Sequence, residues 1–330
     1  MGVAEVLPHL PRLLRLRRTL LKRIEAHATD VFVGIDSPDF NLPASRHLKS
    51  AGIRTVQYVS PQVWAWRQSR VAGIRTAVDL VLCLLPFESG FYASHGVRAI
   101  FVGHPLADAI PLEVDAAQAK LRLGFDADKP FVAVLPGSRR REVAGLAQPF
   151  MATAAWLQRE RPNLEIAVAL ASESIGELFR ATVRGVDLPR AAHLITGQAR
   201  DVMAAADVVL TASGTASLEA LLLKRPMVVA HRIAPLTYWL VRKLGVAKLP
   251  HFSLPNLLAG RSVVPEFVQD QVRPDVLGPA LLKFLDGEPR DAGWYDSFAG
   301  IHRELRRDAS ATAAIAVLEM LRETSSDRRI

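Results

Sequence analysis

The chain has 330 residues, half of them hydrophobic, which is enough for a sizeable core and argues against a disordered protein. Its 41 Lys and Arg residues outnumber 33 Asp and Glu residues, and the net charge of +8 favours anionic partners such as nucleic acid, anionic lipid or a phosphorylated substrate. The one cysteine, Cys83, excludes a disulfide within the chain, and the longest apolar runs, such as residues 80–85, are far too short to cross a bilayer.

Residues 3–27 have the pattern of a basic amphipathic helix. Leucines recur there at helical spacing. Six cations stand against the single acid Glu5 over residues 1–23, namely Arg12, Arg15, Arg17, Arg18, Lys22 and Arg23. Such a helix indicates binding to a membrane surface. The alternative is a solvated helix that packs one face on the core of its own domain.

After this segment, short apolar runs alternate with helical patterns. The expected strands are residues 31–35, 54–59, 79–85, 99–102, 131–135, 165–170, 191–195, 207–211 and 226–230. Strands separated by helices predict an α/β fold with parallel sheets, and nine strands suit two doubly wound, Rossmann-like sheets better than one. We expect a first domain over residues 1–105, a second over 106–273, and helices packing across the domains over 274–330.

Two polar segments follow strands of the first half. Strand 31–35 runs into Asp36, a Ser-Pro turn and Asp39, and ligands bind beyond the carboxyl ends of parallel strands. Turns and helix caps also use Asp, so both interpretations stay open. The segment "YVSPQVWAWR", residues 58–67, offers Trp64 and Trp66 as an aromatic wall for a sugar or an acyl chain, or else a loop packed against its own domain.

In the second half, strand 131–135 leads into "LPGSRRREV". Gly137 permits a tight turn, and Ser138 with the following amides can face an anion at a helix N-terminus. Arg139 adds a charge that can bind phosphate in a bidentate way. An ordinary turn and helix cap with solvated arginines is the alternative.

A second loop of small residues follows strand 207–211. Ser213, Gly214 and Thr215 open a helix, and Glu219 comes one turn later, where it could accept hydrogen bonds from ribose hydroxyls. A helix cap with a solvent-facing Glu is the alternative. Together the two loops predict a cradle for a nucleoside diphosphate. Neither is a Walker A loop or a G-x-G-x-x-G loop, which disfavours ATP hydrolysis and dinucleotide redox chemistry.

Metal ligands are not evident. The nine histidines form no close pairs, and Asp126 with Asp128 precedes a strand, at the end of the sheet where a turn is the better interpretation. We therefore expect neither a metal nor a cofactor. No RNA- or DNA-binding motif accompanies the basic residues, so nucleic acid is not an expected partner.

Seven segments, taken in order, resemble the lipid-A-disaccharide synthase family: "VFVGIDSPDFNL", "YVSPQVWAWR", "LPFE", "FVGHPL", "LPGSRRREV", "ASGTASLEALLLKRPMVV" and "SLPNLLAG". The resemblance implies a GT-B glycosyltransferase that works with inversion and without a metal. Such enzymes join UDP-2,3-diacylglucosamine to 2,3-diacylglucosamine 1-phosphate (lipid X) through a β-1,6 bond and release UDP. It also implies a cytoplasmic protein, peripheral on the inner face of the inner membrane, and a possible homodimer.

The resemblance assigns roles by position. It implies that Asp36 is the general base and that Asp39 supports it. It implies donor-binding roles for Gly137, Ser138 and Arg139 at the UDP phosphates, and for Ser213, Gly214, Thr215, Glu219 and Asn256.

The chain departs from the family pattern at its start. Family members begin with a strand and a glycine-rich G-E-x-S-G-D loop, and this chain has neither before residue 31. We expect an incomplete first sheet, with either a start codon upstream of Met1 or a truncated chain. The rival interpretations are another UDP-sugar enzyme of the same fold, such as a peptidoglycan glycosyltransferase or a sugar 2-epimerase, and an inactive, membrane-binding homologue.

Overall fold

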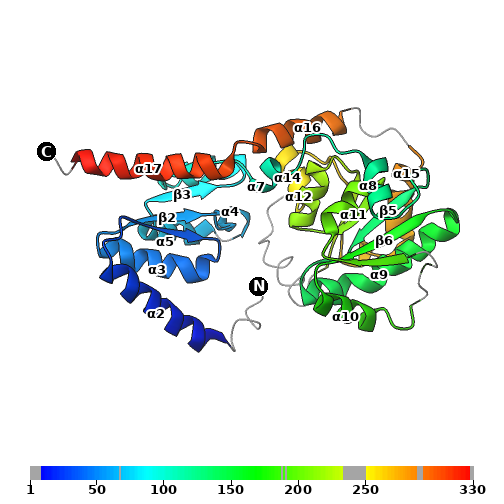
Figure 1. Ribbon diagram of the computed structural model, residues 1–330, viewed down its shortest axis with the longest axis horizontal. Helices are drawn as coiled ribbons and strands as arrows, with labels where there is room; N and C mark the ends of the chain where they lie inside the picture. Colours follow the sequence, from blue (N-terminus) through cyan, green and yellow to red (C-terminus); the bar gives the residue numbers. More distant parts are fainter. Residues whose placement is uncertain are drawn as a thin grey trace. The chain divides into compact units, whose positions relative to one another are not determined.

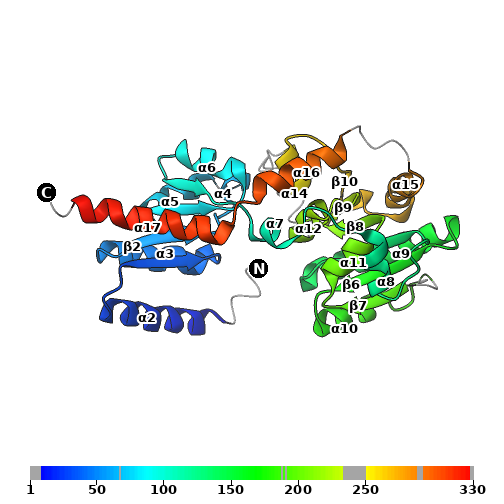
Figure 2. The same ribbon diagram turned by 45° about the horizontal axis from the view of Figure 1, so that its top comes forward.

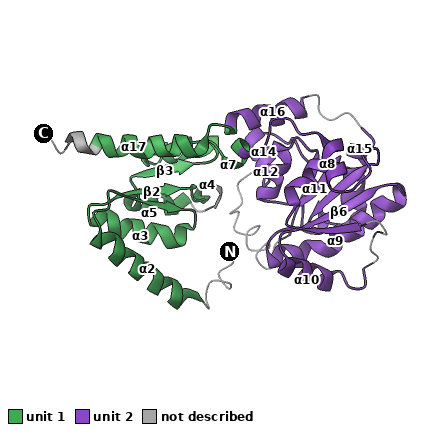
Figure 3. Ribbon diagram, in the orientation of Figure 1, with its two compact units in different colours: residues 1–108, 305–330 green, residues 109–304 purple. Residues whose placement is uncertain are grey.

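A computed structural model describes residues 9–66, 68–186, 189, 192–232, 250–287 and 293–327 (Figure 1). The chain forms two compact units: unit 1 is residues 1–108 with 305–330, and unit 2 is residues 109–304 (Figure 3). The limits 1–105, 106–273 and 274–330 remain a prediction about domains. Of the helices after residue 274, α15 (Pro274–Leu285) lies within unit 2 and α17 (Ala309–Asp327) within unit 1.

Unit 1 is built on a parallel sheet whose four strands follow one another in chain order. They are β1 (Val31–Ile35), β2 (Arg54–Tyr58), β3 (Leu80–Cys83) and β4 (Ala99–Phe101). Helices α3 (Pro38–Ser50), α5 (Val71–Ala77) and α6 (Pro86–Ala93) cover one face, and their core includes Cys83, which is fully buried as expected of a strand cysteine. Because the strands lie in the sheet in the same order as in the sequence, each described crossover adds the next strand on the same side. The reversal of direction expected of a doubly wound sheet is not seen among these strands.

The other face of this sheet is covered by the last helix of the chain. Val56 and Leu82 pack with Ala316 and Met320 of α17 in one buried cluster. An ion pair between Arg98 and Glu323 joins the start of β4 to the same helix. A segment more than 200 residues away in the sequence therefore completes the core of unit 1.

The basic helix is observed as α2 (Leu10–Ala26), which lies beside α3 in Figure 2. Glu25 of α2 binds His47 of α3 at 2.7 Å. Leu10, Leu14 and Leu16 remain exposed. Residues 3–8 of the predicted helix lie outside the described residues. Within the described residues, the structure has no helix long and apolar enough to cross a membrane.

Unit 2 holds a six-stranded parallel sheet in the order β10-β9-β8-β5-β6-β7. Its strands are β5 (Phe131–Leu135), β6 (Glu165–Leu170), β7 (Ala192–Thr196), β8 (Val208–Ala212), β9 (Met227–His231) and β10 (Glu266–Val268). All nine predicted strands of the chain are present, and β10 is an additional strand of three residues. The α/β prediction with two parallel sheets is confirmed.

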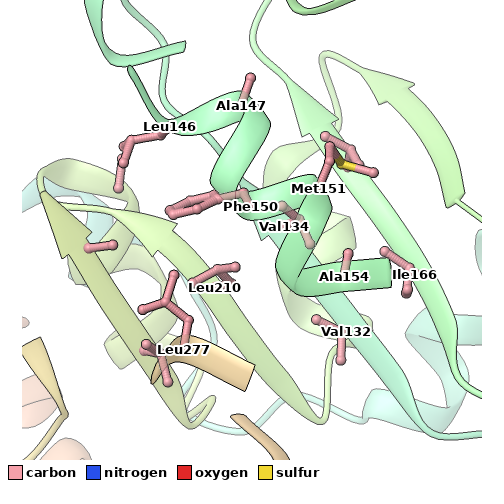
Figure 4. Packing of buried hydrophobic residues seen from close by; sticks show 14 of the residues in the cluster. Val132, Val134, Leu146, Ala147, Phe150, Met151, Ala154, Ile166, Leu210 and Leu277 are labelled. Atoms are coloured by element: carbon pink, nitrogen blue, oxygen red, sulfur yellow. The ribbon is translucent and has the colours of Figure 1, made fainter. Parts of the chain in front are cut away.

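Helices cover both faces of the second sheet. On one face, α9 (Arg140–Glu160), α10 (Glu173–Thr182) and α15 enclose a core in which Phe150 and Met151 lie among strand residues such as Val134 and Leu210 (Figure 4). On the sheet also lie α11 (Ala199–Ala205) and α12 (Thr215–Leu222), which contact α8 (Ala116–Arg122) and α14 (Leu254–Ala259), respectively. Helix α16 (Trp294–Leu305) ends where the chain returns to unit 1.

Candidate functional site

The winding of the second sheet reverses between β5 and β8. The chain passes from β5 to β6 and β7 on one side, and then to β8, β9 and β10 on the other, while β5 and β8 pair directly. In open parallel sheets, ligands bind outside the carboxyl ends of the strands at such a reversal. The two predicted loops, residues 136–139 and 213–215, follow β5 and β8 and therefore flank this point.

The loop after β5 turns at Gly137, whose φ is +117°. A Cβ atom at this position would lie 2.5 Å from the Cβ of Glu142, so both the backbone conformation and the space require glycine. The turn leaves Ser138 and Arg139 exposed just before α9. Their amides lie at the N-terminal end of a 21-residue helix, where a negative charge is stabilised.

The carboxylate of Glu142 lies against these amides. Its Oε2 accepts hydrogen bonds from the amides of Ser138 (3.1 Å) and Arg139 (3.2 Å), and its Oε1 accepts one from the Arg139 guanidinium at 2.8 Å. The loop thus holds an anionic group of the chain itself. Sequence analysis did not single out Glu142, although a Glu three residues after a cap position is the usual signal for such a return contact.

The loop after β8 also turns at a glycine. Gly214 has φ +144° and open space around the position of a Cβ atom, and it caps α12. Ser213 donates from its Oγ to the carbonyl of Phe252 at 3.2 Å, and Thr215 is exposed. Glu219 is half-buried and accepts from Nε of Arg200 at 3.3 Å, so this carboxylate has a partner that the sequence did not reveal.

Asn256 lies on α14 and is fully buried. Its Nδ2 donates to the carbonyl of Val264 at 2.9 Å, and its Oδ1 accepts from the amides of Val263 (2.7 Å) and Val264 (2.9 Å). The side chain therefore fixes the segment before β10. Its role near the donor stays a prediction. With these contacts, Asn256 would act indirectly, by holding the main chain of Val263 and Val264 in place.

His231 ends β9 next to the same loops. Its ring packs against that of Phe252, with centroids 5.9 Å apart. Burial lowers the pKa of His231, and the negative charge of Glu142 partly opposes that shift. A neutral imidazole therefore stands beside the loop that carries Ser138 and Arg139 at neutral pH.

In unit 1, the chain turns sharply where β1 ends. Asp36 and Ser37 have φ values of +51° and +38°, and neither is a glycine. The left-handed conformation costs a non-glycine residue about 1–2 kcal/mol, so surrounding contacts must hold it. The amide of Asp36 donates to the carbonyl of Tyr58 at 2.9 Å. Asp36 is exposed, and among the described residues its carboxylate has no hydrogen-bond or ion-pair partner.

Two buried amide side chains hold this turn. Asn41 donates to the carbonyls of Ile35 (3.0 Å) and Asp36 (2.7 Å). A Cβ atom on Gly34 would lie 2.9 Å from the Cβ of Asn41, so the glycine in "GID" makes room for this asparagine. Gln57 of β2 also donates to the carbonyl of Asp36, at 3.0 Å. Neither amide was singled out from the sequence.

Asp39 stands apart from Asp36 in its contacts. It lies in the first turn of α3 and binds Nη2 of Arg70 at 2.6 Å. Its side chain is 83% exposed. This carboxylate links α3 to Arg70, which follows the Trp-containing loop after β2.

The aromatic loop after β2 is packed against its own unit. Nε1 of Trp64 donates to Glu88 at 3.0 Å, and the Trp64 ring meets Phe87 edge to face at 4.8 Å between centroids. Glu88 also accepts from Oγ of Ser60 at 2.6 Å, and burial raises the pKa of this carboxyl. The side chain of Trp66 lies outside the described residues. For Trp64, the structure favours the packed-loop interpretation over an open aromatic wall.

The two units offer different chemistry. In unit 2, two main-chain amides and Arg139 bind the carboxylate of Glu142, whereas in unit 1 the Asp36 carboxylate stands on a fixed turn without a partner among the described residues. Amides and a guanidinium can stabilise phosphate oxygens. A carboxylate without a cationic partner can accept a proton from a hydroxyl group.

Comparison with known proteins gives a consistent match. The family model described as lipid-A-disaccharide synthetase matches residues 1–319. The lipid-A-disaccharide synthase of Alkalilimnicola ehrlichii is 52% identical over 320 residues, which cover 96% of this chain and 83% of that protein. The enzyme of the same name from Xanthomonas campestris pv. campestris is 50% identical over 323 residues, covering 97% of this chain and 74% of the relative.

Solved structures match the fold at low sequence identity. A UDP-GlcNAc 2-epimerase from Neisseria meningitidis, bound to UDP-GlcNAc, superposes with a TM-score of 0.60 at 13% identity, covering 94% of this chain and 81% of that one. The glycosyltransferase of kitacinnamycin superposes with a TM-score of 0.56 at 17% identity, covering 97% of this chain and 83% of that one. These structures are similar to this chain in fold alone.

Proposed function

Because the chain belongs to the lipid-A-disaccharide synthase family, we propose that it transfers diacylglucosamine from UDP-2,3-diacylglucosamine to 2,3-diacylglucosamine 1-phosphate. The products are the β-1,6 disaccharide 1-phosphate and UDP. The observation that carries this proposal is the pair of anion-ready loops after β5 and β8, on either side of the reversal in the sheet.

The proposed donor site uses both loops. The diphosphate would take the amides of Ser138 and Arg139 that now donate to Glu142, and the Arg139 guanidinium would turn from Glu142 to a phosphate oxygen. Gly137 and Gly214 keep side chains away from the phosphates, and Ser213 and Thr215 supply hydroxyls. Glu219, oriented by Arg200, is proposed to accept from the ribose, and Asn256 to hold the neighbouring segment.

The proposed chemistry is one displacement with inversion. The primary hydroxyl of the acceptor attacks the anomeric carbon of the donor as the bond from that carbon to the UDP oxygen breaks. Asp36 takes the hydroxyl proton, a contribution typically worth about 10²–10⁴-fold in rate. UDP leaves with the extra negative charge, which the amides and Arg139 stabilise. Asp39, bound to Arg70, is proposed to orient the first turn of α3.

The test is a product assay with both lipid substrates. We expect one UDP released per disaccharide formed, with the disaccharide identified by mass and by its β-1,6 linkage. A UDP-sugar isomerised at C2 without transfer would instead place the chain with the epimerases. Absence of the disaccharide, in protein that still binds UDP, would overturn the proposed activity.

We further propose that α2 carries the protein to anionic membranes such as the inner face of the inner membrane. Six cations lie within residues 12–23, and exposed leucines accompany them on α2. Arginines near an anionic surface contribute about 1 kcal/mol each, and salt screens them. A homodimer, which the resemblance allows, is not needed for this binding.

Vesicle sedimentation tests the membrane proposal. Changing Arg15, Arg17 and Arg18 together to Glu should abolish binding to vesicles with anionic lipid, and added salt should weaken binding of the unchanged protein. The matched control reverses three exposed arginines of unit 2, Arg122, Arg159 and Arg184, which changes the net charge equally. Equal loss of binding in both triple variants would show that only net charge matters and would remove α2 from the proposal.

A further inference from the structure

We propose that Gln57 is a positioning residue that fixes the main chain at Asp36 and ties it to the aromatic loop. This inference rests on the proposed role of Asp36 as the general base. Gln57 would not touch the substrate. Its effect on turnover would pass through the position of one carboxylate.

The amide of Gln57 bridges the ends of two neighbouring strands. Gln57 pairs with Gly34 across the sheet and is fully buried. Its Nε2 shares two protons among three carbonyl oxygens: those of Asp36 (3.0 Å), Tyr58 (3.2 Å) and Val59 (3.2 Å). One side chain thus binds the end of β1 and the end of β2 at once.

The carbonyls it binds belong to strained turns. Val59 has φ +68°, which is a genuine outlier for a β-branched residue, and Asp36 has φ +51°. Such conformations persist only where surrounding contacts over-determine them, and they gather at functional sites. Gln57 is bound to the carbonyl groups of both strained residues.

In the described part of the chain, only the NH₂ group of this buried amide is hydrogen-bonded. Within the described residues, Oε1 of Gln57 is buried and has no hydrogen-bond partner. A buried acceptor without a partner is costly, and an apolar side chain of similar size would avoid that cost. The glutamine is therefore placed for what its NH₂ group holds.

The aromatic loop gives Gln57 a rigid point of attachment. Glu88 binds Oγ of Ser60 and Nε1 of Trp64, and the hydroxyl of Tyr92 donates to the carbonyl of Pro61 at 2.9 Å. The residues directly after Val59 are thus held by α6. Gln57 therefore connects the turn at Asp36 to this rigid segment, in addition to the connection through its own strand.

The experiment compares two substitutions on one strand. Gln57→Met keeps a similar volume but removes the donors, and Thr55→Val removes a buried side-chain hydrogen bond to Ala77 two residues earlier on the same face. We expect Gln57→Met to lower kcat about 10- to 100-fold, since a small misplacement of a reacting group has such effects. UDP affinity should be unchanged in both variants, and Thr55→Val should keep normal kcat.

A readout that does not need turnover accompanies the assay. The amide of Asp36 donates to Tyr58, and we expect its hydrogen exchange to quicken at least tenfold in Gln57→Met but not in Thr55→Val. If Gln57→Met does not fold, Asn41→Ala removes the other donor to the Asp36 carbonyl and should quicken the same amide. Unchanged exchange at Asp36 in a folded variant that lacks either donor would overturn the proposal.

A double-mutant cycle separates this inference from the proposed function. If Gln57 acts through Asp36, adding Gln57→Met to Asp36→Asn should cost no further activity. Full additivity of the two losses would mean a merely structural effect and would overturn the inference. Normal turnover in Asp36→Asn alone would defeat the general-base assignment itself, which is a different result.

Discussion

In unit 1, the strand ends at Asp36 and Val59 turn left-handed without glycine, whereas in unit 2 the turns after β5 and β8 occur at Gly137 and Gly214. The unit 1 turns are held by buried amide side chains, which bind main-chain carbonyls. The unit 2 turns are permitted by the absence of a side chain, and after β5 two main-chain amides bind the carboxylate of Glu142.

The difference fits the roles that we propose for the two strand ends. A proton acceptor is one atom of one side chain, so its main chain must be rigid and its residue cannot be glycine. A diphosphate is a larger and more symmetrical charge, which several main-chain amides can bind together if no Cβ atom intervenes. In the proposed mechanism, the same position in two parallel sheets thus serves two kinds of chemistry through two ways of turning the chain.

The largest expected effect tests the unit 1 side of this comparison. Asp36→Asn keeps the shape of the side chain but removes the proton acceptor, so turnover should fall about 10²–10⁴-fold. The fold and UDP affinity should be retained, because Asp36 lies in unit 1 and its side chain has no partner among the described residues. Asp39→Asn serves as the matched control and should lose much less. Near-normal turnover of Asp36→Asn in the lipid transfer assay would contradict the assignment.

The next effect tests the unit 2 side. Arg139→Ala should weaken UDP binding by about 1.5–3 kcal/mol, the range for a hydrogen bond to a charged group. That corresponds to roughly a 10- to 150-fold higher dissociation constant by calorimetry. Arg140→Ala is the control, because Arg140 is the next residue and is equally exposed. If Arg139→Ala binds UDP like the unchanged protein, the Arg139 side chain does not bind the phosphates.

The smallest expected effect comes from placing a glycine in a unit 1 turn, as in the turns of unit 2. Ser37 is exposed, has φ +38°, and makes no side-chain cap hydrogen bond, so Ser37→Gly removes strain without removing a contact. We expect stabilisation of up to about 1 kcal/mol, seen as a Tm rise of roughly 1–4 °C. Ser37→Ala keeps the strain and should not stabilise. A lower Tm for Ser37→Gly than for Ser37→Ala would show that the turn carries no relievable strain.

Periodicity in the sequence predicted the parts of the fold that depend on local pattern. The nine predicted strands each lie in an apolar run, even β4 with its three residues. β10 is equally short, but it follows Pro265 and begins with Glu266, so no apolar run marks it. The position of the two loops proposed to bind the donor depends on strand order. Sequence alone predicted that both follow strands, and the structure adds that those strands, β5 and β8, are direct neighbours.

The partners of the site residues were harder to predict. Glu142 was within reach, since it lies three residues from a cap, but Arg200 meets Glu219 across 19 residues and Gln57 meets Asp36 across 21. A side-chain amide leaves no periodic signal that says which carbonyl it will bind. The sequence therefore identified the chemically distinctive residues and missed those that hold them in place.

The return of α17 to unit 1 has a consequence for the order in which the protein can be completed on the ribosome. The apolar face that includes Val56, Leu80 and Leu82 is synthesised by the time β4 ends at Phe101, yet the helix that covers it begins at Ala309. At about 5–20 residues per second, translating the intervening stretch of about 200 residues takes roughly 10–40 s. Unit 2, which lies wholly within residues 109–304, has all its residues before that helix is made. The sheet of unit 1 thus emerges before unit 2 but is closed after it, and its uncovered face must be kept from aggregation throughout that interval.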